Sequence, residues 1–163
     1  MIPTANLPLI MNAAYKNYQR GLTGGDLAPS TDANGILITH CNQFIQAICA
    51  EMGYDAMNGM LANEMFDFML APANGWIAVD YDVAQQHANA GVLVILAYKN
   101  PVPGHHGHVT LVLPGICEPS QSFMGPVPKI ASIGRLVSFG LPIDATFLPT
   151  EAIQCFALAG MIG

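Results

Sequence analysis

The hydrophobic pattern of this chain changes at Gly91. Before that residue, apolar side chains recur at helical spacing in the segments 6–18, 39–53, 61–70 and 82–90. After it, apolar and β-branched residues form runs at 92–98, 108–113, 129–133, 137–139 and 152–159. A turn-rich loop, NPVPGHHG, joins the first two runs, which therefore predict an antiparallel hairpin. Helices followed by a meander of strands predict an α+β domain.

The composition excludes several classes of function. Charged residues make up 10% of the 163 residues and hydrophobic residues 52%, and the net charge is −6 with 5 Lys and Arg in total. We therefore expect one domain over residues 1–163 and no basic surface for nucleic acid. No apolar run reaches the roughly 18 residues of a membrane-spanning helix, so we expect no membrane insertion. The first residues lack the basic start and apolar core of a secretory signal peptide.

The predicted helix at 39–53 carries a cysteine in its first turn. Cys41 lies on the same stripe as the apolar residues of this helix, while Thr39 suits the N-cap and Gly53 the C-cap. Unpaired backbone N–H groups and the helix dipole favour a thiolate at this end of a helix. Cys41 is therefore a candidate nucleophile. The alternative is a small apolar core residue, which free cysteines usually are.

A nucleophilic cysteine needs a base, and histidine is the usual one because its pKa lies near neutrality. Among the 5 histidines, His108 is the best placed, because it opens a predicted strand and a rigid strand aims a side chain better than a loop. His40 is adjacent to Cys41 and points in a different direction. His87 is expected at the surface. The alternative for His108 is a turn residue without a role.

The other cysteines suggest neither a zinc knuckle nor a dense disulfide framework. Cys49 lies about 12 Å along the helix from Cys41, too far for a disulfide, whereas a bridge between Cys117 and Cys155 is compatible with the sequence. A competing interpretation is a non-enzymatic metal-binding protein that uses His105, His106, His108 and Cys117. The three histidines are close together in sequence and carboxylates are scarce, so we expect no metal and no cofactor.

A cysteine on a helix, followed about 70 residues later by a strand that begins Gly-His-Val, resembles the papain-like cell-wall amidases of the NlpC/P60 and CHAP type. The chain is most similar to the type VI secretion amidase effectors. Their order of segments is matched by HCNQFIQAICAEMG, LANEMFDFM, ANAG, an apolar strand and GHVTLVLPG, at residues 40–53, 61–69, 88–91, 92–98 and 107–115. The resemblance covers roughly residues 38–140.

The resemblance implies a papain-like fold, with N-terminal helices packed on an antiparallel sheet, and a cysteine amidase reaction. Cys41 would be the nucleophile, its N–H an oxyanion donor, and His108 the base. These families usually have a third polar residue on the next strand to orient the histidine. Ser132 is the first candidate for it, and the alternatives are Glu118 and, more remotely, Asp144 and Glu151.

The implied substrate is a stem-peptide amide of peptidoglycan, with the bond between D-glutamate and diaminopimelate as the expected target. Asn42, Asn63 and His106 are the residues expected to bind the peptide, in a groove with few fixed charges where shape matters more than salt bridges. The protein would be an antibacterial effector secreted to the periplasm of a target bacterium, with an immunity protein as its inhibitor. The alternative is a papain-like peptidase or acyltransferase with a substrate outside the cell wall.

Overall fold

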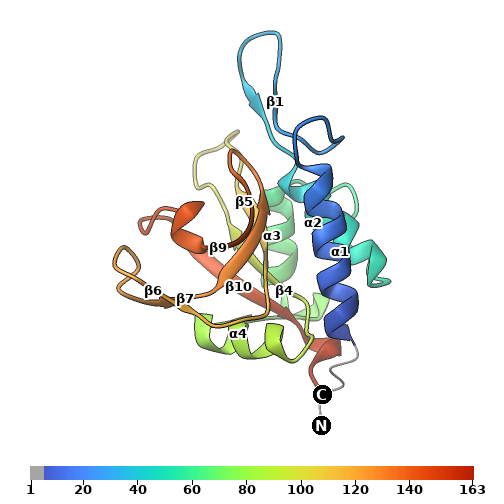
Figure 1. Cartoon of the computed structure of the whole chain (residues 1–163), viewed down its shortest axis with the longest axis vertical. Helices are drawn as coiled ribbons and strands as arrows, with labels where there is room; N and C mark the ends of the chain where they lie inside the picture. Colours follow the sequence, from blue (N-terminus) through green and yellow to red (C-terminus); the bar gives the residue numbers. More distant parts are fainter. Residues whose placement is uncertain (1–5) are drawn as a thin grey trace.

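The computed structural model describes residues 6–163, whose main feature is a six-stranded antiparallel sheet (Figure 1). The last strand of the chain lies inside this sheet, between the first of the six strands and the predicted hairpin. The strands follow in the spatial order β3 (Trp76–Val79), β10 (Ile153–Leu158), β4 (Val94–Tyr98), β5 (His108–Val112), β8 (Lys129–Ile133) and β9 (Val137–Pro142).

Helices cover both faces of the sheet. On one face α1 (Leu7–Arg20), α2 (Cys41–Glu51) and α3 (Ala62–Leu70) enclose the larger core, and on the other α4 (Tyr81–Asn89) covers a second core. The side chains of β4 alternate between them, because Ile95 belongs to the first core and Leu96 to the second. A strand that is buried on both sides explains the continuous apolar run in the sequence.

The prediction of an α+β domain with N-terminal helices on an antiparallel sheet is confirmed. The predicted hairpin is β4 paired with β5, in a register that places Tyr98 opposite His108. The expected helix caps are shifted. α2 has His40 rather than Thr39 at its N-cap, and α4 has Asp80 there instead of Asp82. Both shifts are within the uncertainty with which terminal turns are placed from sequence.

Two small hairpins extend beyond the central sheet. β1 (Ser30–Thr31) pairs with β2 (Leu37–Ile38), and this hairpin projects from the top of the molecule in Figure 1. β6 (Glu118–Ser120) pairs with β7 (Gly125–Val127). Short 3-10 turns span Pro72–Asn74, Ile143–Ala145 and Ala159–Met161. The sequence pattern predicted no strand in either hairpin and no helical turn in these three places.

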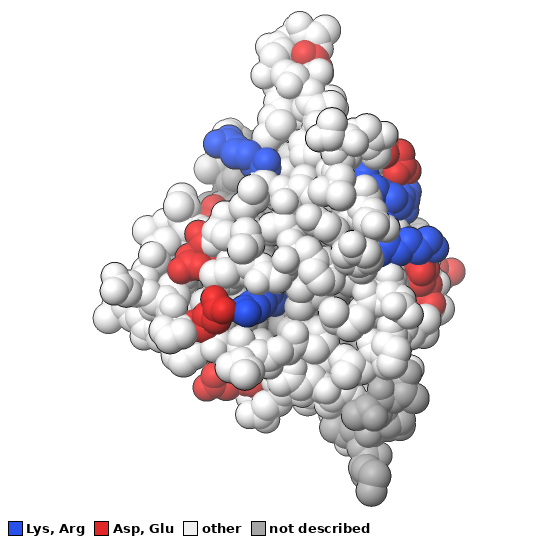
Figure 2. Space-filling view, in the orientation of Figure 1, with Lys and Arg blue, Asp and Glu red and all other residues white. Residues whose placement is uncertain are grey.

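Charged groups are thinly spread over the surface. Figure 2 shows one face on which Lys and Arg atoms are scattered and form no continuous patch, with uncharged surface between them. Within residues 6–163, no helix combines the length and the apolar character needed to cross a membrane.

Candidate active site

Cys41 is the first residue of α2, and only 5% of its surface is exposed. The helix begins here because His40, at the N-cap, has a φ of −121° and a ψ of 31°. Near the Cys41 sulfur lie the backbone of Val109, of Asn42 and of Cys41 itself, and the Thr39 side chain, all of which favour the ionised thiol. Several donors therefore converge on the sulfur, at a helix end whose N–H groups have no partner within the helix.

The net effect of these surroundings is a thiol that is hard to ionise. Burial raises the pKa of the Cys41 thiol above its usual value, and the surrounding donors lower it only in part. The expectation that the helix N-terminus would make Cys41 a ready thiolate is therefore wrong. Removal of the sulfur from water outweighs the helix end, so at neutral pH the thiol keeps its proton and a base is needed to remove it.

The imidazole of His108 is held by Ser132. Its Nε2 lies 2.9 Å from Ser132 Oγ, and Ser132 is completely buried on β8. Among the described residues, Nδ1 of the ring has no hydrogen-bond partner. When Nε2–H donates to the serine, Nδ1 carries the lone pair that a general base requires.

The surroundings of the His108 ring are apolar on two sides. The ring packs against Phe147, with centroids 5.3 Å apart, and against the backbone at Gly134, where an added Cβ would lie 2.6 Å from Cε1. Although part of the residue remains accessible, desolvation lowers the pKa of His108 to about 4. The imidazole is therefore neutral at neutral pH and able to accept a proton.

Cys41 and His108 approach the same end of β5. Only Leu111 and Val112 of β5 pair with β8, so the two strands separate before the residues that open β5. The Cys41 sulfur meets the backbone of Val109, while the neighbouring His108 ring packs on Phe147 in the core on the other face. Within residues 6–163, no direct hydrogen bond joins the Cys41 sulfur to the ring.

A cleft of about 520 Å³ opens over His108. Its walls come from the projecting hairpin, from the loop that precedes β5, and from the segment between β8 and β10. His106 is exposed and lines this cleft, as expected for a residue that contacts substrate. It also lines a smaller hollow of about 180 Å³ beside the start of α3.

The structure gives Asn42 and Asn63 internal partners instead of the expected contacts with substrate. The Asn42 amide donates to the Met60 carbonyl at 3.0 Å. The Asn63 amide donates to the His105 carbonyl at 2.9 Å, and its oxygen accepts from the Asn100 N–H at 3.0 Å. Asn42 therefore anchors the segment before α3, and Asn63 anchors the loop before β5 and lines the smaller hollow together with His106. Backbone carbonyls in irregular segments need donors, and a nearby amide satisfies them.

The carboxylates considered as alternatives to Ser132 all have other partners. Glu118 pairs with Lys129 Nζ at 2.8 Å, Asp144 accepts from Ser120 Oγ at 2.8 Å, and Glu151 accepts from the Leu148 N–H at 3.0 Å. Ser132 is the candidate that lies within hydrogen-bonding distance of His108.

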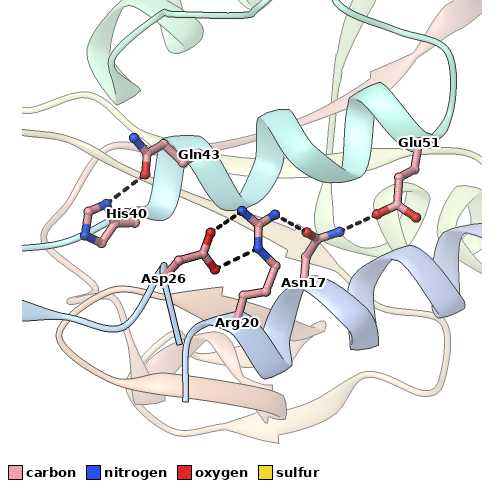
Figure 3. A network of polar contacts seen from close by, with 6 residues as sticks. All are labelled: Asn17, Arg20, Asp26, His40, Gln43 and Glu51. Atoms are coloured by element: carbon pink, nitrogen blue, oxygen red, sulfur yellow. Dashed lines mark hydrogen bonds and ion pairs between the residues drawn. The ribbon is translucent and has the colours of Figure 1, made fainter. Parts of the chain in front are cut away.

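The position of α2 is fixed by polar contacts with α1. Figure 3 shows Asn17 of α1 at the centre of this network, donating to Glu51 at 2.8 Å and accepting from Arg20 at 2.8 Å. Arg20 also holds Asp26 through two contacts, at 2.9 and 2.7 Å. At the other end of α2, His40 Nδ1 lies 2.8 Å from Gln43 Oε1. These contacts stabilise the helix that presents Cys41.

The ligands of the metal-binding interpretation are not brought together. Cys117 contacts Gln85 at 3.8 Å, whereas His108 contacts Ser132. Among the described residues, no group of three or more His, Cys, Asp or Glu side chains could hold a metal ion. All four cysteines are free thiols, so the bridge between Cys117 and Cys155 does not form.

Three residues of the site were not anticipated from the sequence. Arg135 and Phe147 line the cleft, Gly134 packs against the His108 ring, and all three come from the segment after β8. The turn Gly134-Arg135, between two predicted strands, was the one signal that could have placed two of them there.

Comparison with models of known protein families gives no match for this chain, and comparison with curated protein sequences gives none either.

Proposed function

We propose that the protein is a cysteine amidase of the papain-like NlpC/P60 type, with Cys41 as nucleophile, His108 as base and Ser132 as the residue that orients the base. One observation carries the proposal. His108, whose ring is fixed by a completely buried serine, directly precedes Val109, whose backbone lies near the Cys41 sulfur. A nucleophile, a base and an orienting group in sequence are the elements of nucleophilic amide cleavage.

The reaction starts from a neutral pair. His108 Nδ1 takes the thiol proton as the Cys41 sulfur attacks the amide carbonyl, and the backbone N–H groups of Cys41 and Asn42 stabilise the oxyanion. The imidazolium then gives its proton to the leaving amine as the C–N bond breaks, which leaves an acyl-enzyme. A water molecule, deprotonated by His108, attacks the acyl carbon and releases the acid and the thiol. Ser132 keeps the ring aligned throughout.

The proposed substrate is the peptide stem of peptidoglycan, cleaved between D-glutamate and diaminopimelate. This choice rests on the resemblance to the type VI secretion amidase effectors. The cleft of about 520 Å³ has the volume of a site for a short peptide. The protein would then act in the periplasm of a target bacterium, and an immunity protein would be its natural inhibitor.

A digest of purified muropeptides tests the proposal directly. The wild-type protein should release new amino and carboxyl ends, identified by liquid chromatography and mass spectrometry. Cys41→Ala should release none, while Cys49→Ala, a matched change on the same helix, should cleave normally. If a protein whose thiol reacts with iodoacetamide leaves muropeptides intact, the wall is not its substrate. A papain-like peptidase or acyltransferase acting elsewhere then becomes the better interpretation.

Expression in two compartments gives an independent test. The chain should be tolerated in the bacterial cytoplasm, because the wall lies outside it. The same chain directed to the periplasm by an added signal peptide should lyse the cell, and Cys41→Ala should prevent lysis. Equal toxicity in both compartments would argue against the wall as target.

A further inference from the structure

Arg135 differs from the other cations of this chain. The sequence contains 5 Lys and Arg residues in total. Among the described residues, all but Arg135 form an ion pair with a carboxylate. These pairs are Lys16 with Glu51 at 3.2 Å, Arg20 with Asp26 at 2.7 Å, Lys99 with Asp67 at 2.6 Å and Lys129 with Glu118 at 2.8 Å.

Arg135 lies in the tight turn that joins β8 to β9. The Gly134 N–H donates to the Leu136 carbonyl at 3.2 Å, which closes the turn. Gly134 is also the residue whose backbone packs against the His108 ring. Arg135 is therefore anchored one residue from a contact with the proposed base, and it lines the same cleft as His108.

The cleft contains little other charge. Glu151 also lines it, but one carboxylate oxygen of Glu151 is occupied by the Leu148 N–H, and Glu151 forms no ion pair with Arg135 in the described residues. The rest of the wall combines apolar side chains such as Phe147 with uncharged polar ones such as Asn100 and Thr146. Arg135 is exposed, so its guanidinium is open to an incoming anion. The cleft thus contains few fixed charges, and Arg135 is the lining residue that could pair with a carboxylate.

We infer that Arg135 binds a carboxylate of the peptide substrate and so makes the enzyme select acidic peptides. The inference rests on the proposed amidase function. A guanidinium presents parallel N–H donors that match the two oxygens of a carboxylate. In a stem peptide linked through the side-chain carboxyl of D-glutamate, the α-carboxylate stays free beside the scissile amide. The contact would hold that amide over Cys41 and His108.

A matched pair of muropeptides tests this inference, one with free carboxylates and one in which the same carboxylates are amidated. The wild-type enzyme should prefer the free acid in kcat/KM by about 10- to 100-fold, which is the usual worth of a hydrogen bond to a charged group. Arg135→Gln should largely remove this preference, and Arg135→Lys should keep part of it. Lys16→Gln, which removes a positive charge from α1, should leave the preference unchanged. A preference that survives in Arg135→Gln would overturn the inference.

A second measurement applies if the wild-type protein cleaves no muropeptide. In a Cys117→Ser background, the alkylation rate of Cys41 by iodoacetate, an anion, is compared with that by neutral iodoacetamide. The rate with iodoacetate divided by the rate with iodoacetamide should fall several-fold in Arg135→Gln and should not fall in Lys16→Gln. That result supports an anion site at Arg135 although the proposed substrate is wrong. An unchanged ratio overturns the inference as well. Conversely, cleavage without acid preference would refute the role of Arg135 and leave the amidase function intact.

Discussion

α2 carries two buried cysteines in different surroundings. Cys41 and Cys49 are 5% and 1% exposed, and burial raises the pKa of both thiols, that of Cys49 to about 12. Hydrogen-bond donors separate the two. Cys41 is surrounded by backbone groups of neighbouring residues and by the Thr39 side chain, while Cys49 has only its own backbone. Burial therefore does not distinguish the two thiols, whereas the groups around them do.

The sheet explains this difference. The Cys41 end of α2 meets the backbone of Val109 near the start of β5, where β5 no longer pairs with β8. Both cysteines belong to the apolar core that α1, α2 and α3 build on the sheet. The two positions on one helix therefore differ in the polar groups around the thiol.

Replacing each cysteine by alanine should show the largest contrast. Cys41→Ala should reduce muropeptide turnover by at least about 10³-fold, because no other group can form the acyl-enzyme. Cys49→Ala should turn over at close to the wild-type rate. Iodoacetamide should inactivate the wild-type protein and a chelator should not. If both variants are folded and both lose activity, the proposal that Cys41 acts in the reaction and Cys49 does not would be contradicted.

Acid stability should reveal the neutral imidazole of His108. The pKa of His108 is about 4 in the folded protein, against 6.5 for a free side chain. Below pH 6.5 the unfolded state binds a proton that the folded state does not, so the free energy of unfolding falls as pH drops from 6.5 to 4. This contribution amounts to about 3 kcal/mol.

The comparison for this measurement is His108→Gln, which cannot titrate. Urea unfolding of both proteins at several pH values should show a wild-type loss of stability between pH 6.5 and 4 that the variant lacks. Equal pH dependence in both proteins would mean that His108 titrates normally, and the neutral starting pair would then be wrong.

A larger side chain at Cys49 should test its role as a core residue by lowering the stability of the protein. Cys49→Leu inserts extra carbon atoms into a closely packed core and should destabilise the protein by about 1–3 kcal/mol. The residual folded enzyme should keep its kcat. Thermal unfolding together with activity measured well below the transition checks both parts. Unchanged stability would place a cavity beside Cys49, contrary to its burial among core residues.

The sequence predicted most helices and strands well, but it did not predict which strands lie side by side. The strand at 129–133 has the predicted bounds, and the 92–98 and 108–113 runs form the expected hairpin. Periodicity reports which face of an element is buried, so it identifies helices and strands. It does not report which strand lies beside which, and the insertion of β10 between β3 and β4 was therefore not foreseen.

Predictions for the site were limited in the same way, because sequence patterns do not report which segments lie side by side. Cys41 and His108 could be proposed from residue type and from their places at the start of a predicted helix and strand. Ser132 came from the family resemblance, and the structure places it beside the histidine ring. The amides of Asn42 and Asn63 were expected to face substrate, but loop carbonyls bind them. Long-range contacts of this kind depend on where loops fold back, and local sequence patterns do not encode it.

The smallest expected effect concerns two serines that face each other across β8 and β9. Ser132 and Ser138 are paired in register, and both are buried. Ser132 bonds the His108 ring, whereas the Ser138 hydroxyl has no partner among the described residues. Ser132→Ala should lower kcat by about tenfold, the cost of roughly one hydrogen bond to the base, with little change in KM. Ser138→Ala should leave kcat unchanged.

Two further measurements separate positioning from simple loss of packing. Ser132→Thr keeps the hydroxyl and should recover part of kcat. The acid limb of kcat/KM should lie near pH 4 in the wild type, where His108 gains its proton, and should not move upward in Ser132→Ala, because a hydrogen bond that holds the charged ring has been removed and its pKa can only fall. If Ser138→Ala lowers kcat as much as Ser132→Ala, the serine acts through the stability of the strand pair, and the orienting role assigned to Ser132 is incorrect.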